Sequence, residues 1–272
     1  MKRAYVVSRE YKVMLRAAKF AGREPALLAA AAAFWNDFAR AIQGQIIDIN
    51  GSLRTIAQRR RIQFFDTASA DLTAAGYCVR VRRDVKDGTP EVTLKFRHED
   101  RYLSESRRIR TRVPDADIKF EEDIKAPFVS LYSFSATAAV GKRQRPSDLR
   151  GLVKLFPSLS RRIDHPRGKL PLSAIGAFTA RELVITGTTF QIGRGPKVEA
   201  ECALIVWYDD DKRANRPQAV EFSFRYGNPK EQYGGGPARR AFAIFKTLQS
   251  LKTWLDPHPR TKTRFVLDKQ KK

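Results

Sequence analysis

Positively charged side chains recur at every second residue in several segments of this chain. Arg80 is followed by Arg82, and Lys95 by Arg97. Successive side chains of an extended strand point to opposite faces, so each of these pairs shares one face. Like charges side by side on a sheet repel each other. Such rows suit the binding of a polyanion better than they suit an ordinary surface.

Acidic side chains show the same spacing in other segments, next to further cations. The two-residue spacing covers Glu10 with Lys12; Lys119, Glu121 and Asp123; Glu199 with Glu201; and Glu221 with Ser223 and Arg225. Any one such row is more often the solvated outer face of an antiparallel sheet. Six segments with the same pattern favour a shared charged interior, in which cations bind a phosphate chain and a few carboxylates bind a metal ion.

This combination of residues suits phosphoryl transfer. The reaction asks little covalent chemistry of a protein, because positioning and charge neutralisation supply most of the catalysis. Rows of Lys and Arg together with a divalent metal ion provide both. The three histidines of the chain are not at metal-ligand spacing, which argues against a zinc centre or a catalytic triad.

The composition also points to anionic partners. The chain of 272 residues has 52 Lys and Arg against 29 Asp and Glu, a formal charge of +23. This charge attracts a small triphosphate, nucleic acid or an anionic membrane alike, so it leaves all three open. The chain has no signal-peptide pattern and no apolar stretch long enough to span a bilayer. We therefore expect a cytoplasmic protein that does not bind membranes.

Periodic apolar residues predict mostly strands, with helices near both ends. A helix should begin near Pro25 and continue to Ile42, another should cover 147–155, and a C-terminal helical segment should cover 237–256. The expected strands, eight or nine in number, are 4–15, 59–67, 76–84, 91–100, 107–113, 117–124, 181–189, 198–208 and 219–226.

We predict an α+β fold: a closed antiparallel eight-stranded β-barrel, or tunnel, with helices packed outside. A barrel of about eight strands encloses room for one small ligand. The charged side chains would face inward and the apolar ones outward. The prediction is a single domain over 1–272, with a core of about 4–226 and a basic tail at 268–272. We expect no disulfide between Cys78 and Cys202.

Several motifs resemble the CYTH domain of the triphosphate tunnel metalloenzymes. They are REYKVML near the N-terminus, FFDTASADLTAAGYCVRVRR, TLKFR, KFEEDI and AVEFSF, in that order. The middle block is the most specific, and the resemblance covers roughly Val6 to Tyr226. It implies an eight-stranded tunnel in which cations hold a triphosphate and glutamates hold Mg²⁺ or Mn²⁺ for attack on the terminal phosphorus.

The resemblance assigns roles to individual residues. The family's Glu-x-Glu-x-Lys falls on Ser8, Glu10 and Lys12, and its late Glu-x-Glu falls on Glu221 and Ser223, so two acids are replaced by serine. We expect Lys12 and Lys95 to be catalytic. The predicted metal ligands are Glu10, Glu121, Asp123 and Glu221. The predicted phosphate ligands are Lys12, Arg80, Arg82, Lys95, Arg97, Lys119, Arg181, Arg225 and Lys262.

The first hypothesis is a metal-dependent hydrolase of a triphosphate-containing substrate, inorganic or organic. Because two acids are lost, a second hypothesis is a non-catalytic protein that binds polyphosphate or nucleic acid on the same scaffold. A nucleic-acid surface could then be formed by Arg59, Arg60 and Arg61, and by Lys142, Arg143 and Arg145, although solvated loops are the simpler interpretation of these residues. An adenylyl cyclase comes third, since no motif specifies adenine recognition.

Overall fold

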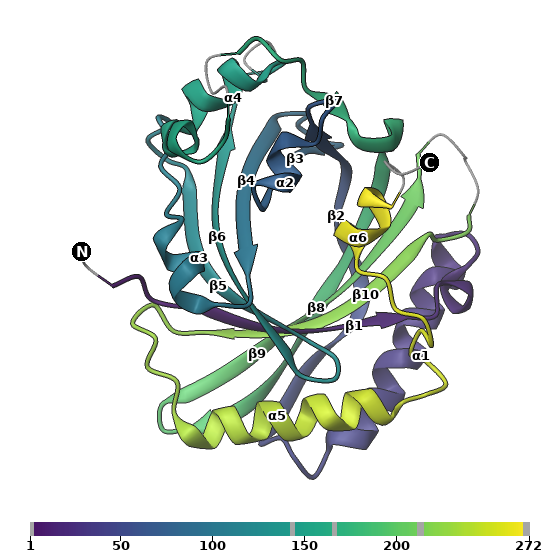
Figure 1. The fold of residues 1–272 in the computed structure, drawn as a ribbon. Coiled ribbons are helices and arrows are strands. Elements are labelled where there is room, and N and C mark those ends of the chain that lie inside the picture. The colour runs from purple at the N-terminus through teal and green to yellow at the C-terminus, as the bar shows by residue number, and fades with distance from the viewer. Residues whose placement is uncertain (1–2, 142–144, 165–167, 211–214, 269–272) are drawn as a thin grey trace.

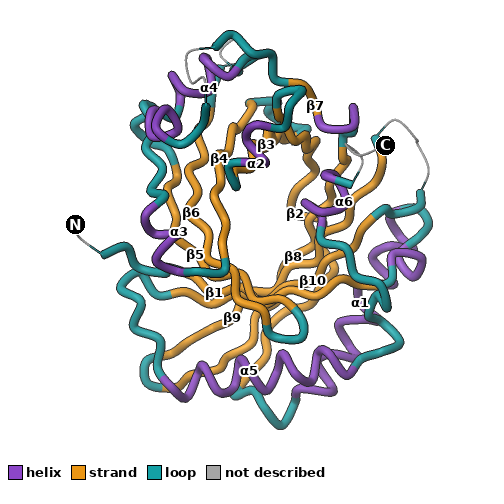
Figure 2. Tube along the Cα trace, in the orientation of Figure 1, coloured by secondary structure: helices purple, strands orange, loops and turns teal. Residues whose placement is uncertain are grey.

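The strands form a single sheet that closes on itself into a ring (Figures 1 and 2). The computed structural model describes residues 3–141, 145–164, 168–210 and 215–268. In this part of the chain the sheet has ten strands in the order β3-β4-β6-β5-β1-β10-β9-β8-β2-β7, and a further pairing of β2 with β3 closes the ring. The strands are β1 (Ser8–Leu15), β2 (Asp48–Asp66), β3 (Tyr77–Asp84), β4 (Pro90–His98), β5 (Asp117–Lys125), β6 (Val129–Ala139), β7 (Ser173–Ala174), β8 (Ala180–Arg194), β9 (Lys197–Asp209) and β10 (Ala219–Gly227).

The closed, strand-built architecture agrees with the sequence prediction, but two of its details were wrong. The sheet is mixed, because β1 pairs in parallel with β5 while it pairs antiparallel with β10. The described strands number ten instead of eight. One of the additional strands is β6, whose serines and alanines give only a weak strand signal.

The strand predicted at 107–113 does not form. This segment follows the short helix α3 (Arg101–Ser106) and runs as a coil. Its backbone bonds to the region of helix α4 (Leu149–Leu155) instead of a strand: the amide of Arg112 donates to the carbonyl of Leu155 at 3.2 Å, and the amide of Arg110 donates to Ser158 Oγ at 2.9 Å. The alternation of apolar residues therefore reflects anchoring of a loop.

Two long helices cover one side of the ring. Helices α1 (Glu24–Ile42) and α5 (Gly235–Ser250) pack on the outer faces of β8, β9 and β10 (Figure 1). Phe34 and Phe38 of α1 contact Phe222 of β10 with ring centroids 4.9 and 5.2 Å apart. A second apolar cluster covers the outer faces of β3, β4 and β6 with α4. The apolar side chains thus face outward under helices, as the sequence predicts.

The segment before β3 sets the position of the first cationic strand. Buried Asp66 ends β2 and accepts hydrogen bonds from the amides of Thr67, Leu72 and Thr73, which fixes the short helix α2 (Asp71–Ala74). Gly76 follows with a positive φ of 79°, and a Cβ there would lie 2.8 Å from the ring of Phe96. The Phe-Asp-Thr and Ala-Gly parts of the middle motif are therefore structural.

The C-terminal helix is shorter than predicted, and a further helix follows it. Helix α5 ends at Ser250, and α6 (Lys262–Leu267) lies at the ring opening (Figure 1). Cys78 and Cys202 are free thiols. No helix in the described ranges has the length and apolar character needed to cross a membrane. Residues 269–272 of the predicted basic tail lie outside the described residues.

Candidate functional site

A cavity of about 500 Å³ occupies the interior of the ring. It is lined by Lys and Arg side chains from β1, β2, β3, β4, β5, β10 and α6, together with fewer acids. Of the predicted site residues it contains Glu10, Lys12, Arg80, Arg82, Lys95, Arg97, Lys119, Glu121, Asp123, Glu221, Arg225 and Lys262. Among the described lining residues, ten Lys and Arg face six Asp and Glu, an excess of four positive charges.

Asp123 of β5 is the centre of an ion-pair network on the cavity wall. Its side chain is 3% exposed, and its Oδ1 lies 2.8 Å from Lys12 Nζ. Its Oδ2 lies 2.7 Å from Arg97 Nη2 and 3.4 Å from Lys95 Nζ. Burial alone would raise the pKa of Asp123, but these three cations hold it well below its ordinary value. Asp123 is therefore a buried anion that keeps three half-buried cations together.

Glu10 lies next to Asp123 on the neighbouring strand and shares its lysine. The two residues are in register on the parallel pair of β1 and β5, and Lys12 Nζ is 2.9 Å from Glu10 Oε2. Burial opposes ionisation of both partners, yet the charge of Lys12 lowers the pKa of Glu10, and the charges of Asp123 and Glu10 raise the pKa of Lys12. One ammonium group thus sits between two carboxylates.

The arginines of β3 form the most strongly cationic part of the wall. Burial, followed by the charges of Arg80 and Arg60, lowers the pKa of Arg82. Arg80 makes one long hydrogen bond, from Nη2 to Thr93 Oγ1 at 3.5 Å. The buried Nε atoms of Arg80, Arg82 and Arg97 have no hydrogen-bond partner among the described residues. Buried donors without acceptors are costly, and a bound phosphate chain would supply acceptors.

The other predicted acids are also engaged by the protein. Glu221 Oε1 accepts a contact of 3.0 Å from Lys262 Nζ, which α6 brings to the cavity. Ser8 Oγ donates to Glu121 Oε1 at 2.9 Å. Lys262 therefore lies at the cavity, while Ser8 binds one of the predicted metal ligands.

Sequence reasoning missed a buried group at the other side of the cavity. Glu182 of β8 is 4% exposed and accepts hydrogen bonds from Arg60 Nε at 2.8 Å and from Trp207 Nε1 at 2.7 Å. Burial raises its pKa, but the charges of Lys262 and Arg60 outweigh this and lower the pKa to about 2. The sequence signal that could have identified Glu182 is the two-residue alternation along β2 and β8, which places both Arg60 and Glu182 on the inward face of the sheet.

Lys125 at the end of β5 is a second residue that was missed. It lines the cavity, and it pairs in register with Lys12 on β1. No ion pair joins its ammonium group to a carboxylate within the described ranges. Burial, followed by the charge of Arg97, lowers the pKa of Lys125 to about 8. Lys125 continues the two-residue spacing of Lys119, Glu121 and Asp123, so extending that pattern by one step would have identified it.

Some predicted site residues lie elsewhere or point to partners at the rim. Arg181 is not among the residues that line the cavity, and its guanidinium lies 4.4 Å from the ring centroid of Tyr208. Arg225 lines the cavity but bonds through Nη2 to Glu201 Oε2 at 2.7 Å, outside it. Lys119 lines the cavity and contacts Asp117 Oδ2 at 2.5 Å.

The cluster Arg59 to Arg61 belongs to β2 and forms neither a loop nor a free patch. Arg59 pairs with Glu24, Arg60 binds Glu182 inside the ring, and Arg61 Nε lies 2.9 Å from Asp210 Oδ2. This corrects the loop interpretation of these residues. Of the companion cluster, Arg145 stacks on Phe65 at 4.7 Å, while Lys142 and Arg143 lie outside the described residues.

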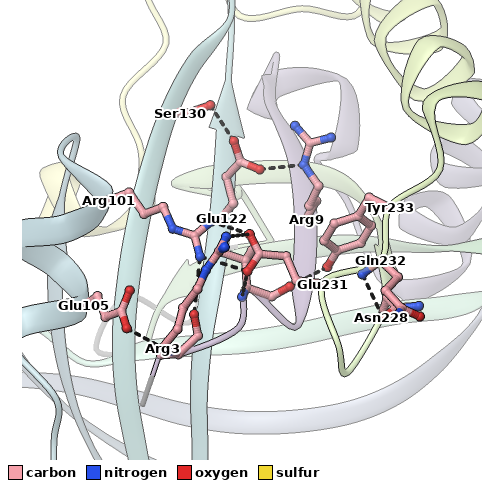
Figure 3. Close-up of polar contacts among 12 residues, drawn as sticks. Arg3, Arg9, Arg101, Glu105, Glu122, Ser130, Asn228, Glu231, Gln232 and Tyr233 are labelled. Atoms are coloured by element: carbon pink, nitrogen blue, oxygen red, sulfur yellow. Dashed lines mark hydrogen bonds and ion pairs between the residues drawn. The ribbon is translucent and has the colours of Figure 1, made fainter. Parts of the chain in front are cut away.

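A polar network outside the ring fixes the strand that carries Glu10 and Lys12 (Figure 3). On the outer face, Arg9 Nε donates to Glu122 Oε2 at 2.5 Å, and Ser130 Oγ donates to Glu122 Oε1 at 2.7 Å. Before the strand, Glu231 accepts from the amide of Val6 at 3.2 Å and from two nitrogens of Arg101. These contacts fix the position of the N-terminal end of β1.

The acids of the cavity fit a divalent ion only in part. No group of three or more His, Cys, Asp or Glu able to hold a metal occurs within the described ranges. Glu10 and Asp123, however, both reach one point cation, the ammonium of Lys12, at 2.9 and 2.8 Å. Mg²⁺ is commonly bound by one or two carboxylates plus substrate phosphates. The residues fit that mode of binding and do not form a cage made of protein alone.

The chain has no match among protein-family models or curated proteins. Solved structures are similar over nearly its whole length. A candidate adenylyl cyclase from Hippeastrum, described as having a dominant triphosphatase activity, shares 11% identity at a TM-score of 0.46, covering 95% of this chain and 93% of that chain. A candidate adenylate cyclase from Bacillus halodurans shares 13% identity at a TM-score of 0.38, covering 97% and 99%.

A further candidate adenylate cyclase, from Vibrio parahaemolyticus, shares 9% identity at a TM-score of 0.38, covering 96% of this chain and 98% of that chain. The chain is similar, at low identity, to structures described as adenylate cyclases and a triphosphatase.

Proposed function

We propose that this protein binds the phosphate chain of a triphosphate-containing substrate in the central cavity and hydrolyses its terminal phosphoanhydride bond. The observation that carries the proposal is the cationic wall of β3 and β4, where buried arginine Nε atoms have no acceptor in the described part of the chain. An excess of four positive charges matches a triphosphate better than it matches a neutral ligand. The substrate is a small polyanion, inorganic or organic.

In this proposal the side chains of the cavity divide the work between binding and charge neutralisation. Arg80, Arg82 and Lys95 bind the phosphate oxygens, and Lys12 neutralises charge that develops near the acids. Water attacks the terminal phosphorus, a new P–O bond forms, and the bridging P–O bond breaks. The diphosphate part of the chain leaves with the bonding electrons, and the proton of the water passes to solvent. Phosphoryl transfer of this kind depends chiefly on positioning and electrostatic stabilisation.

Glu10 and Asp123 are the residues that would hold Mg²⁺ or Mn²⁺, with substrate oxygens completing the coordination. The ion would neutralise phosphate charge and polarise the phosphorus centre. Glu121 and Glu221 are the remaining predicted ligands. To bind the ion, Glu121 would first have to release Ser8, and Glu221 would have to release Lys262.

Binding without turnover is the second candidate function, and one observation favours it. Glu10, Asp123 and Glu221 are each paired with lysine, and the two positions where the family has further acids carry Ser8 and Ser223. A cavity whose acids are already neutralised retains an anion more readily than it recruits a metal ion. The same cations would then make the protein a polyphosphate-binding protein.

The decisive experiment measures phosphate release from inorganic tripolyphosphate, ATP and thiamine triphosphate, with Mg²⁺, Mn²⁺ or a chelator. The variants are Lys95→Ala and, as a matched control outside the cavity, Arg181→Ala. We expect metal-dependent release that falls about 10- to 100-fold in Lys95→Ala, the effect of losing one charge-assisted hydrogen bond. Arg181→Ala should keep its activity.

Two other outcomes would change the assignment. If no substrate releases phosphate but tripolyphosphate raises the melting temperature, the second candidate replaces the first. If tripolyphosphate neither reacts nor raises the melting temperature, the cavity is not a phosphate site and both candidates fail. Equal loss in Lys95→Ala and Arg181→Ala would show that general damage to the fold explains the result.

A further inference from the structure

A basic surface lies outside the ring, on the coil after α3 and on helix α4 with the turn that follows it. The segments 106–112 and 149–162 together contain eight Lys and Arg and no Asp or Glu. Six of these side chains are exposed: Arg110, Arg112, Arg150, Lys154, Arg161 and Arg162. We call these six residues the outer basic surface. None of them lines the central cavity.

Hydrogen bonds join the two segments into one surface. The amide of Arg112 donates to the carbonyl of Leu155, the amide of Arg110 donates to Ser158 Oγ, and Arg162 Nη2 donates to the carbonyl of Ser106 at 3.1 Å. Arg150 and Lys154 are four residues apart on α4 and so share one face. The hydrogen bonds thus join two segments that are far apart in sequence, and Figure 1 shows the backbone of the coil after α3 leading up to the region of α4.

The clustered positive charges of the outer basic surface repel one another, which destabilises the folded protein. Like charges four residues apart on a helix destabilise it, and the nearest acid in sequence, Asp148, is used to cap α4 through the amide of Gly151 at 2.6 Å. An extended polyanion that spans the surface would neutralise these charges and release its own counterions. The central cavity cannot provide this compensation, because it lies on the inner side of the sheet.

The surroundings distinguish nucleic acid from a membrane. Leu149, Leu152 and Leu159 are fully buried, and Val153 and Leu155 are partly buried, so the region lacks the broad exposed apolar face with which a helix inserts into lipid. Beside it, Tyr102 of α3 is 79% exposed and lies one helical turn before Ser106, which Arg162 contacts. An exposed aromatic ring next to cations is the arrangement on which unpaired bases stack.

We propose that the outer basic surface binds single-stranded nucleic acid, with its cations on the phosphates and Tyr102 under a base. This interaction is separate from the proposed triphosphatase activity, because no residue is shared. It accounts for a part of the net charge of +23 that the cavity does not use. It also moves the nucleic-acid hypothesis away from Arg59 to Arg61, which are paired with acids.

The test is fluorescence anisotropy of a labelled 20-nucleotide RNA over a range of salt concentrations. The surface variant carries glutamine at Arg110, Arg112, Lys154 and Arg161, and it keeps Arg162 because of its bond to Ser106. The matched control carries glutamine at four exposed cations elsewhere, Arg54, Arg239, Lys246 and Lys252. Tripolyphosphate-induced stabilisation is measured on both variants to confirm an intact fold and cavity.

We expect the surface variant to bind RNA at least about tenfold more weakly, and the slope of log affinity against log salt to flatten by up to about three, since each phosphate contact contributes about 0.7. The control should change less than about twofold, and Tyr102→Ala should lose about 5- to 100-fold. Equal losses in surface variant and control would overturn the proposal, as would tighter binding of anionic vesicles than of RNA. Failure of tripolyphosphate binding alone would count against the cavity function and not against this surface.

Discussion

Lys12 and Asp123 form an ion pair of 2.8 Å between the neighbouring parallel strands β1 and β5, inside the ring. Because Asp123 also contacts Lys95 and Arg97, removal of this single carboxylate would leave three cations without their main partner. The stability of the cavity wall therefore depends on Asp123. A bound anion, which contacts the same cations, should stabilise the protein more when Asp123 is absent.

We predict that Asp123→Asn lowers the free energy of unfolding by about 3–5 kcal/mol, as expected when one partner of a buried ion pair is removed. Tripolyphosphate should restore more stability to this variant than to the wild type, because its oxygens replace the lost carboxylate. Urea denaturation with and without the ligand measures both effects. Asp117→Asn, which breaks a half-exposed pair with Lys119, should cost less than about 1 kcal/mol. Similar losses in both variants would contradict the prediction.

Glu182 gives a pH dependence of stability whose direction is fixed by its lowered pKa. The folded-state pKa of about 2 lies below the ordinary 4.5, so the unfolded chain binds more protons between these values. The stabilisation is complete above pH 4.5 and is lost as the pH falls toward 2. Glu182→Gln should thus be less stable than wild type at pH 7 by roughly 2–3 kcal/mol, with the gap closing in acid. Urea denaturation at pH 7 and pH 3 measures this, and a constant gap would refute it.

Lys125→Met should change stability and binding in opposite directions. Without its ligand, Lys125 is a desolvated cation among other cations, so its replacement by an apolar side chain should raise the melting temperature. The affinity for tripolyphosphate, measured calorimetrically with chelator present, should fall about tenfold, as expected for one charge-assisted hydrogen bond. Lys119→Met is the matched control on the same strand: its partner is Asp117, and it should weaken binding without raising the melting temperature. A Lys125→Met variant that binds normally would remove this residue from the site.

Ser223→Glu should create a tighter metal site. Ser223 is buried and pairs in register with Lys12, next to Glu10, so a glutamate there would add a third carboxylate to Glu10 and Asp123. We expect Mn²⁺ affinity, measured without substrate, to rise at least about tenfold, since affinity for hard cations follows the number of charged oxygen ligands. Ser223→Gln has nearly the same size and lacks the charge, and it should leave Mn²⁺ binding unchanged. Equal gains in both variants would indicate an effect of volume alone.

The strands and the inward direction of the charged residues could be predicted from the sequence because both follow from a two-residue period. Lys12, Arg80, Arg82, Lys95 and Asp123 all line the cavity for this reason. Arg181 does not, because its neighbour Glu182 faces inward and successive residues of a strand point to opposite faces, which leaves Arg181 on the outside against the ring of Tyr208. The period separates the two faces of a strand but does not say which of them is the inner one.

Other features depend on pairings between distant segments, which no local pattern reports. The parallel pairing of β1 with β5 brings Glu10 beside Asp123 across more than one hundred residues. The hydrogen bond from Trp207 to Glu182 could not be predicted from the sequence either, because it depends on the pairing of β8 with β9. Lys262 was found only through the family resemblance, since a six-residue helix has too little sequence to mark its own docking position.

The position of β1 between β5 and β10 has a consequence for the synthesis of the protein. A ribosome releases the N-terminal strand first, but one of its two neighbours, β10, is completed only at Gly227. Until then β1, which carries Lys12 and Glu10, has at most one neighbouring strand, β5, and the ring is open. Pairings over such sequence distances form slowly, so the nascent chain must keep β1 available, and free of other pairings, for most of translation.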